Sequence, residues 1–175
     1  MKAKWKNWWW YHWWHVLLAA AAAGVILYSF LPGLFKPKED YSVGIISVNG
    51  LTEETVSKIE ERLLIVAEDV NGDGNIHIRI NQFTVDLSGA ASAANYQETA
   101  RLDADLVGKI SCILFIEDYP SFKENTAVPV DEGIPCASLP LFDGLELPKG
   151  MVLTVRSDSS EQAPFDMYQR AISGK

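Results

Sequence analysis

The residues best suited to chemistry form an acidic, glycine-rich run at positions 69–76, Asp-Val-Asn-Gly-Asp-Gly-Asn-Ile. Oxygen-bearing side chains recur there at alternate positions, as they do at the start of a calcium loop of the EF-hand or dockerin kind. Gly74 stands where such a loop turns sharply, a conformation that glycine tolerates best. The run therefore predicts calcium as a cofactor. The predicted metal ligands are Asp69, Asn71, Asp73 and, through its carbonyl oxygen, Asn75.

This candidate calcium loop lacks its last ligand. The twelfth position of an EF-hand loop carries an acid that binds calcium through both oxygens, whereas the corresponding residue here is Ile80. A complete site would need water or another acid, and Glu68 is the nearest acid in the sequence. The same residues are also good turn formers between a helix and a strand. Two interpretations stay open, a modest calcium site and a metal-free turn.

A second candidate is the pair of acids Glu117 and Asp118, which follows the apolar run 112–116. In folds built on parallel strands, ligands bind beyond the carboxyl ends of the strands. Two carboxylates there could bind a cation or act as acid and base. The alternative is that they simply begin a solvated loop.

Other catalytic or metal-binding arrangements are missing from the sequence. His77 is the only histidine after His15, which excludes a histidine-rich zinc site in the larger part of the chain. No Gly-x-Ser-x-Gly elbow, phosphate loop or Gly-x-Gly-x-x-Gly motif occurs. Two cysteines, Cys112 and Cys136, leave a disulfide open without implying a framework. We therefore expect no catalytic residues.

Charge divides the chain into two parts. All 23 acids lie at or after Glu39, where the ten basic residues leave a formal charge of −13, while the first 38 residues contain lysines and no acid. Such asymmetry indicates two different environments. The acidic part is a poor partner for nucleic acid, because binding phosphates needs a basic surface.

The elements that must position these residues alternate between strand and helix. Residues 41–48 are apolar and β-branched, which predicts a buried strand, and Thr52 is suited to cap a following helix. In the next strand the apolar residues change phase near Asn81 and Gln82, which predicts a β-bulge. The remaining predicted elements are a helix over 95–109 with Tyr96, Ala100, Leu106 and Val107 inward, strands over 112–116 and 151–156, and a helix from Pro164 to Ile172.

This order predicts an α/β domain over residues 41–175, with a small, mainly parallel sheet and helices on its faces. Parallel strands need crossover connections, and the predicted helices would supply them. Residues 117–150 are rich in proline and acid, and their pattern assigns no element.

The strand ending in Ile80-Asn-Gln-Phe83 and the apolar strand ending in Ile113-Leu-Phe-Ile-Glu-Asp118 carry a resemblance. Their order, with a helix before each, is similar to the first lobe of bacterial extracellular solute-binding proteins. It also resembles uncharacterised membrane-anchored extracytoplasmic proteins of Gram-positive bacteria that share the Asp-Val-Asn-Gly-Asp-Gly segment. The resemblance covers residues 41–172 and implies one lobe, because a two-lobed ligand clamp would need a longer chain.

The N-terminal part predicts a membrane anchor. Residues 16–35 contain no charge, and as a helix these 20 residues would span about 30 Å, the thickness of the hydrocarbon layer. Residues 1–15 hold all six tryptophans and three lysines, typical of a cytoplasmic segment at the headgroup layer. Residues 36–40 form the linker, and the following domain is expected outside the cytoplasm. The alternative is a cleaved signal peptide.

These observations favour a membrane-tethered, extracytoplasmic and non-enzymatic binding or interaction module. Family analogy suggests that it is an accessory to a membrane transport complex. Its expected partners are membrane lipid and a membrane protein, which would contact the small residues Ala20 and Gly24 or the acidic domain. The alternatives are a calcium-stabilised structural domain and an enzyme that uses the carboxylates of Glu117, Asp118 or Asp131.

Overall fold

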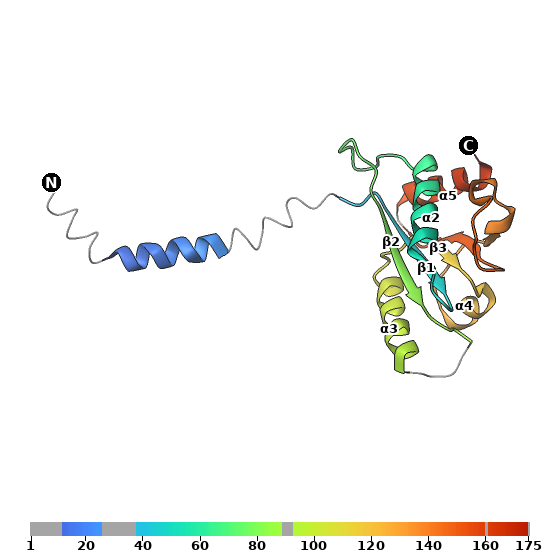
Figure 1. Ribbon diagram of the computed structural model, residues 1–175, viewed down its shortest axis with the longest axis horizontal. Coiled ribbons are helices and arrows are strands. Elements are labelled where there is room, and N and C mark those ends of the chain that lie inside the picture. Colours follow the sequence, from blue (N-terminus) through green and yellow to red (C-terminus); the bar gives the residue numbers. More distant parts are fainter. Residues whose placement is uncertain (1–11, 26–37, 89–92, 160, 175) are drawn as a thin grey trace. The chain divides into compact units, whose positions relative to one another are not determined.

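The computed structural model describes residues 12–25, 38–88, 93–159 and 161–174 (Figure 1). The chain divides into two compact units, Met1–Lys38 and Glu39–Lys175. In the first unit, residues 12–25 are helical. Within the described ranges, no helix combines the length and the apolar character that crossing a bilayer requires. Residues 26–35, the second half of the predicted span, lie outside the described residues.

The second unit confirms the predicted α/β class, with helices on the faces of a five-stranded sheet in the order β2-β1-β3-β5-β4. The strands are β1 (Tyr41–Ser47), β2 (Ile78–Thr84), β3 (Ile113–Ile116), β4 (Ile134–Pro135) and β5 (Val152–Val155). The helices are α2 (Glu53–Val66), α3 (Ala93–Val107), α4 (Tyr119–Asn125) and α5 (Gln162–Ser173), with 3-10 turns η1 (Cys136–Ser138) and η2 (Pro140–Phe142).

The sheet is mixed, so the prediction of a mainly parallel sheet is wrong for the strands β4 and β5. β1 pairs in parallel with β2 and β3, but β5 runs antiparallel to both β3 and β4. The reason lies in the stretch that the sequence left unassigned. After α4 the chain returns to the edge where β3 begins, and Val130 bridges Arg156 there. β4 then leads the chain back, so β5 enters the sheet from the opposite edge.

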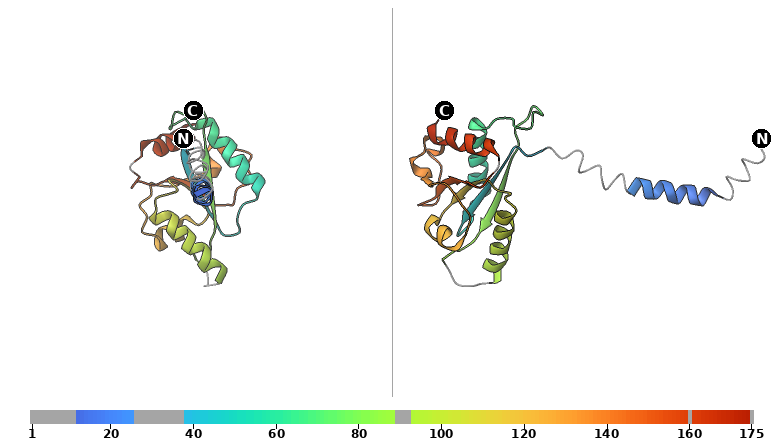
Figure 2. Two further views of the ribbon diagram at one scale, coloured as in Figure 1. Left: turned by 90° about the vertical axis from the view of Figure 1, so that its left-hand side faces the viewer. Right: turned by 180° about the vertical axis from the view of Figure 1, so that it is seen from behind.

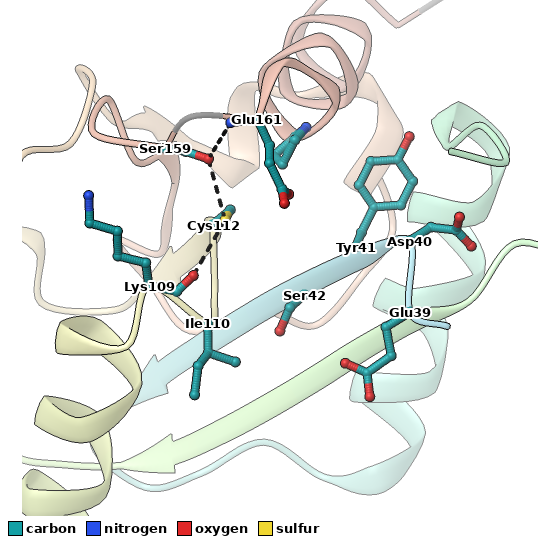
Figure 3. Close-up of a pocket in the computed structure, with 10 residues that line it drawn as sticks. Glu39, Asp40, Tyr41, Ser42, Lys109, Ile110, Cys112, Ser159 and Glu161 are labelled. Carbon is teal, nitrogen blue, oxygen red and sulfur yellow. Dashed lines mark hydrogen bonds between the residues drawn. The ribbon is translucent and has the colours of Figure 1, made fainter. Parts of the chain in front are cut away.

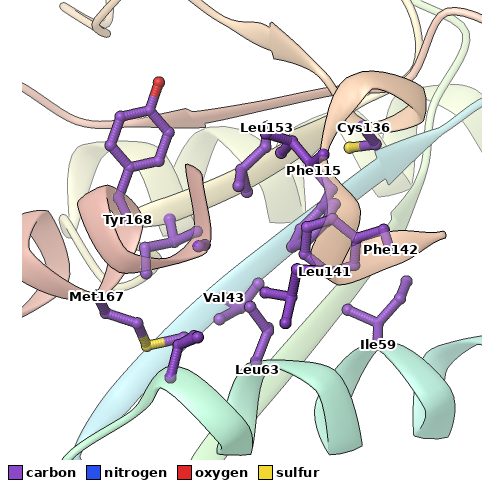
Figure 4. Packing of buried hydrophobic residues seen from close by; sticks show 14 of the residues in the cluster. Val43, Ile59, Leu63, Phe115, Cys136, Leu141, Phe142, Leu153, Met167 and Tyr168 are labelled. Atoms are coloured by element: carbon purple, nitrogen blue, oxygen red, sulfur yellow. The ribbon is translucent and has the colours of Figure 1, made fainter. Parts of the chain in front are cut away.

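Each face of the sheet has its own apolar cluster, because alternate strand residues point to opposite sides. Val43 and Ile45 of β1 belong to the larger cluster, which includes residues of α2, α5 and η2. In that cluster the rings of Phe115 and Phe142 meet edge to face, with centroids 5.3 Å apart (Figure 4). Ile46 belongs to the smaller cluster, with residues of α3 and α4. Figure 2 shows the helices on both sides of the sheet.

β2 contains no bulge, contrary to the prediction. Its pairing with β1 is unbroken from Tyr41↔Ile78 to Ser47↔Thr84. The change of apolar phase arises because two polar residues point to opposite faces and each has a partner. Asn81 Nδ2 donates to Asp105 Oδ2 of α3 across 3.2 Å, and Gln82 Nε2 donates to the Leu51 carbonyl oxygen across 3.2 Å.

The buried face of α3 also differs from the prediction. Leu106 is buried, as predicted, and Leu102 is buried although it was not predicted to be. Tyr96 and Val107, which were predicted to face inward, are 77% and 84% exposed. Ala100 is exposed as well, so the error is one of helical phase: positions 98, 99, 102, 105 and 106 form the inward face of α3, and Tyr96, Ala100 and Val107 lie on the opposite face. The predicted helix N-cap at Thr52 is confirmed, since its side chain accepts the Thr55 N–H at 3.2 Å.

Candidate functional site

The acidic run folds as a tight loop between α2 and β2, and Asp69 organises it. Asp69 Oδ1 accepts the Gly72 N–H at 2.7 Å, and Asp69 Oδ2 accepts the Gly74 N–H at 2.8 Å. Gly72 and Gly74 have φ values of 74° and 86°, in the left-handed region that side chains other than glycine rarely adopt. Asp69 therefore closes the turn with both of its oxygens.

The other predicted ligands repeat this local pattern. Asn71 Oδ1 accepts the Asp73 N–H at 2.8 Å, and Asp73 Oδ1 accepts the Asn75 N–H at 2.9 Å. Such hydrogen bonds from a side chain to the backbone two residues on are the chemistry of a stable turn. The nearby acid Glu68 forms an ion pair with Arg170 instead, at 2.9 Å. The structure thus places the four predicted ligands in one loop, where local turn hydrogen bonds account for their arrangement.

Asp40 fixes this loop from outside. Its Oδ1 accepts the N–H groups of Val70 and Asn71, each at 3.0 Å, and its Oδ2 accepts the His77 N–H at 2.8 Å. Burial acts to raise the pKa of the Asp40 carboxyl, but the three N–H donors outweigh it and hold that pKa below its usual range. Sequence reasoning missed Asp40, because it lies about 30 residues before the loop it binds.

No group of three or more His, Cys, Asp or Glu side chains in the described parts of the chain is arranged to hold a metal ion. The predicted calcium site also uses asparagine and carbonyl oxygens, which are not among these four residue types. Calcium binding by the 69–75 loop therefore stays a prediction, with the metal-free turn as its alternative.

A four-way comparison separates these interpretations. If the loop binds calcium, millimolar calcium should raise the melting temperature of the wild-type protein relative to chelator, because a ligand of the folded state stabilises it. Asp73→Ala removes one oxygen from the loop and should abolish that increase. In the metal-free turn, the same substitution lowers the melting temperature equally with calcium and with chelator. Differential scanning calorimetry of both proteins under both conditions measures the outcome.

The predicted acids at the carboxyl ends of the parallel strands have structural partners. Glu117 Oε2 accepts the Val48 N–H at 2.8 Å and so joins the ends of β3 and β1. Asp118 caps α4, since its Oδ1 accepts the Ser121 N–H at 3.2 Å. Asp131 lies at the opposite edge of the sheet, where its N–H donates to the Val155 carbonyl oxygen. The structure does not bring the three predicted carboxylates together.

A pocket of about 360 Å³ opens at the other edge of the sheet, where β1 and β3 begin (Figure 3). We call it the amino-edge pocket. Its walls come from three segments: the start of β1, the connection from α3 to β3, and the connection from β5 to α5. The lining residues are Glu39, Asp40, Tyr41, Ser42, Lys109, Ile110, Cys112, Ser159, Glu161 and Pro164.

The backbone turns that form this pocket have identifiable causes. α3 ends at Val107, and Lys109 adopts a φ of 52°, which redirects the chain toward β3. The Cys112 N–H then donates to the Ser42 carbonyl oxygen at 3.1 Å, which joins this connection to β1. On the opposite wall, Ser159 Oγ accepts the Glu161 N–H at 3.2 Å just before α5.

Cys112 is the buried thiol of the pocket. Its Sγ lies 3.7 Å from Ser159 Oγ and 3.9 Å from the Lys109 carbonyl oxygen. Burial raises the pKa of the Cys112 thiol, and the nearby Glu161 carboxylate adds to that increase. Both cysteines are free thiols, and burial raises the pKa of Cys136 to about 12. The pair that the sequence left open is therefore not a disulfide in this structure.

Sequence reasoning did not find the amino-edge pocket. Its residues lie in segments about 70 and 50 positions apart, and none of these segments carries a recognisable motif. Comparisons of the chain with protein-family models, with curated proteins and with solved structures found no match.

Proposed function

We propose that the unit Glu39–Lys175 is a non-enzymatic binding module that takes a small ligand in the amino-edge pocket, and that the first unit tethers it to a membrane. The pocket carries this proposal. Its volume of about 360 Å³ lies within the range of small-molecule sites. It combines apolar walls, such as Ile110 and Pro164, with hydroxyl and charged groups, a combination that binds and orients small ligands.

The surroundings of the acids support binding without turnover. Glu117 and Asp118 each accept a backbone N–H, which gives both a structural role. Within the pocket, the raised pKa of Cys112 keeps its thiol protonated at neutral pH, whereas a nucleophilic cysteine reacts as the thiolate.

The helix in the first unit supports the tether. Residues 12–25 contain no acid, lysine or arginine, and every one of them is exposed, with Trp14 and Leu18 at 63% and 65%. An apolar helix surface of this kind is stable only against an apolar environment. The tryptophans and lysines that flank the helix in the sequence favour lipid as that environment. Ala20 and Gly24 lie on the same helix, where a methyl group and a bare Cα would let a second helix approach closely. A membrane protein of a transport complex is the partner we propose there.

Extraction tests the tether. The full-length protein should stay in the membrane pellet after alkaline carbonate and high salt, at the size of the uncleaved chain, because an inserted apolar helix is not released by removing charge interactions. Protease added outside the cell should remove the acidic domain. Recovery of a soluble form that lacks roughly the first 30 residues would show a signal peptide instead.

Filling the pocket tests the binding module. In a thermal-shift screen of amino acids, sugars and polyamines against the full-length protein in mild detergent, at least one compound class should raise the melting temperature. Ser159→Phe places a ring in the pocket wall and should abolish the shift. Ser57→Phe, at an exposed position of α2, is the matched control and should leave it intact. A shift that survives Ser159→Phe would contradict binding in this pocket.

A further inference from the structure

The charges of the amino-edge pocket are unbalanced. Three carboxylates line it, those of Glu39, Asp40 and Glu161, against one ammonium group, that of Lys109. Glu39 and Glu161 are exposed to solvent and Asp40 is buried. An excess of negative charge around a pocket raises the local concentration of positively charged ligands. Which of these groups is available to a ligand depends on the contacts that each already makes.

Most of these charges are already committed. Lys109 Nζ lies 3.1 Å from Asp158 Oδ2 and also donates to the Asp158 carbonyl oxygen at 3.0 Å. Glu39 Oε1 pairs with Arg79 at 3.3 Å. Both oxygens of Asp40 accept N–H groups from the 69–77 segment. These three side chains therefore contribute charge and shape to the pocket, but each is held by another part of the fold.

Glu161 is the exception. Its backbone N–H binds Ser159, but in the part of the chain that the structure describes its carboxylate has no ion-pair partner. Its side chain extends into the pocket from the segment just before α5 (Figure 3). The hydroxyl oxygens of the lining already accept hydrogen bonds, Ser42 Oγ from Asn81 Nδ2 at 3.2 Å and Ser159 Oγ from the Glu161 N–H at 3.2 Å. Among the pocket's carboxylates, that of Glu161 is therefore the acceptor left for a ligand by the described residues.

We propose that the ligand is a small organic cation, a protonated primary amine whose ammonium group binds the Glu161 carboxylate. An ammonium group carries a positive charge and three N–H donors, and a carboxylate without an ion-pair partner is a strong acceptor for it. The hydrocarbon part of the amine packs on Ile110, which is 47% exposed, and on Pro164. This assignment rests on the proposed function, because it names the ligand class of the same pocket.

An anionic ligand fits the pocket less well. The first turn of α5 has no side-chain cap, and a helix N-terminus attracts negative charge. However, Glu161 occupies the N-cap position itself and would repel an anion there. The only ammonium group in the pocket lining is paired with Asp158. The balance of charge therefore favours a cation.

Protection of Cys112 from alkylation reports directly on occupancy of the pocket. The full-length protein in mild detergent is treated with iodoacetamide at about pH 9, where part of the thiol ionises and an alkylammonium is still charged. The reaction is run with n-butylammonium, n-butanol or butyrate, three probes of similar size and different charge. Mass spectrometry follows Cys112, with the buried Cys136 as an internal reference. n-Butylammonium should slow alkylation of Cys112, while the alcohol and the carboxylate should not.

Variants then locate the contact. Glu161→Gln keeps the size of the side chain and should raise the n-butylammonium concentration for half protection about tenfold, since it replaces a charge-assisted hydrogen bond. Glu124→Gln makes the same change at an exposed position of α4 outside the pocket and should have no effect. Half protection is compared, rather than the rate itself, because Glu161 also influences the thiol.

The outcomes separate the two proposals. Equal protection by n-butanol, or protection by butyrate, would overturn the amine assignment and leave a ligand pocket in place. Protection by n-butylammonium that Glu161→Gln does not weaken would also overturn it. If none of the three probes protects Cys112 while the thermal-shift screen finds a compound that Ser159→Phe excludes, the pocket stands and the ligand class is wrong.

Discussion

Arg156→Met should lower the free energy of unfolding by about 3 kcal/mol, the low end of the cost of breaking a buried ion pair. The Arg156 side chain is only 3% exposed. Its Nε and Nη2 donate to the two oxygens of Asp158 at 2.9 and 3.0 Å, and its Nη1 donates to the Leu106 carbonyl oxygen at 2.6 Å. Methionine fills much of the space but leaves those acceptors without their donor.

The expected loss of unfolding free energy lies at the low end of the range for buried ion pairs, because Asp158 keeps other stabilising contacts in the variant. Lys109 Nζ remains 3.1 Å from the Asp158 carboxylate. The Asp158 side chain is 24% exposed, so water can solvate part of its charge. In the wild type, hydrogen bonds from Arg156 hold the pKa of Asp158 far below its usual range. Adding Asp158→Asn to Arg156→Met should therefore recover part of the lost stability, because it removes the charge that has lost its principal partner.

Urea unfolding followed by circular dichroism measures this effect, since the sequence of the second unit contains no tryptophan that could serve as a fluorescence probe. Lys58→Met is the matched control, because it breaks a pair with Glu54 in which both side chains are exposed, and such pairs add little to stability. If Arg156→Met and Lys58→Met shift the midpoint equally, the buried pair does not hold the end of α3 to β5.

Arg156 also illustrates what local patterns can and cannot predict. The apolar run before it predicted β5 correctly, because burying a strand on both faces leaves a visible composition. Asp158 lies only two positions away, but an acid beside an arginine is equally common on a surface, and the acceptor that joins Arg156 to α3, the Leu106 carbonyl oxygen, is 50 residues away. The direction of β5 was also missed, because it depends on β4, a strand of two residues inside a proline-rich stretch.

The candidate site divides in the same way. The 69–75 loop was found from sequence because its turn hydrogen bonds join residues no more than five positions apart, as Asp69 and Gly74 show. The amino-edge pocket was not found, because Ser42, Cys112 and Glu161 meet only through the order of strands in the sheet. A local pattern therefore predicted a turn, and the arrangement of the sheet was needed to reveal a cavity.

Asp40→Asn should destabilise the second unit at neutral pH by about 2 kcal/mol, since hydrogen bonds to a charged group contribute about 1.5–3 kcal/mol and a carboxamide can accept only some of them. The wild-type carboxylate accepts N–H groups from Val70, Asn71 and His77. Hydrogen exchange should quicken at these three amides, while the amides of β3 should change only with global stability. Asp143→Asn, at an exposed position, is the matched control.

The pH dependence of this effect has a definite sign. The folded state holds the pKa of Asp40 below its ordinary value, so the unfolded chain binds the proton more tightly. The stabilisation from Asp40 is therefore complete above the ordinary pKa, near pH 4, and is lost as the pH falls through the lower pKa of the folded protein. Urea midpoints measured from neutral pH downward should show the gap between wild type and Asp40→Asn narrowing below about pH 4. A gap that stays constant down to the lowest pH would mean that the charge of Asp40 does not hold the 69–77 segment, and that the loss in the variant comes from shape alone.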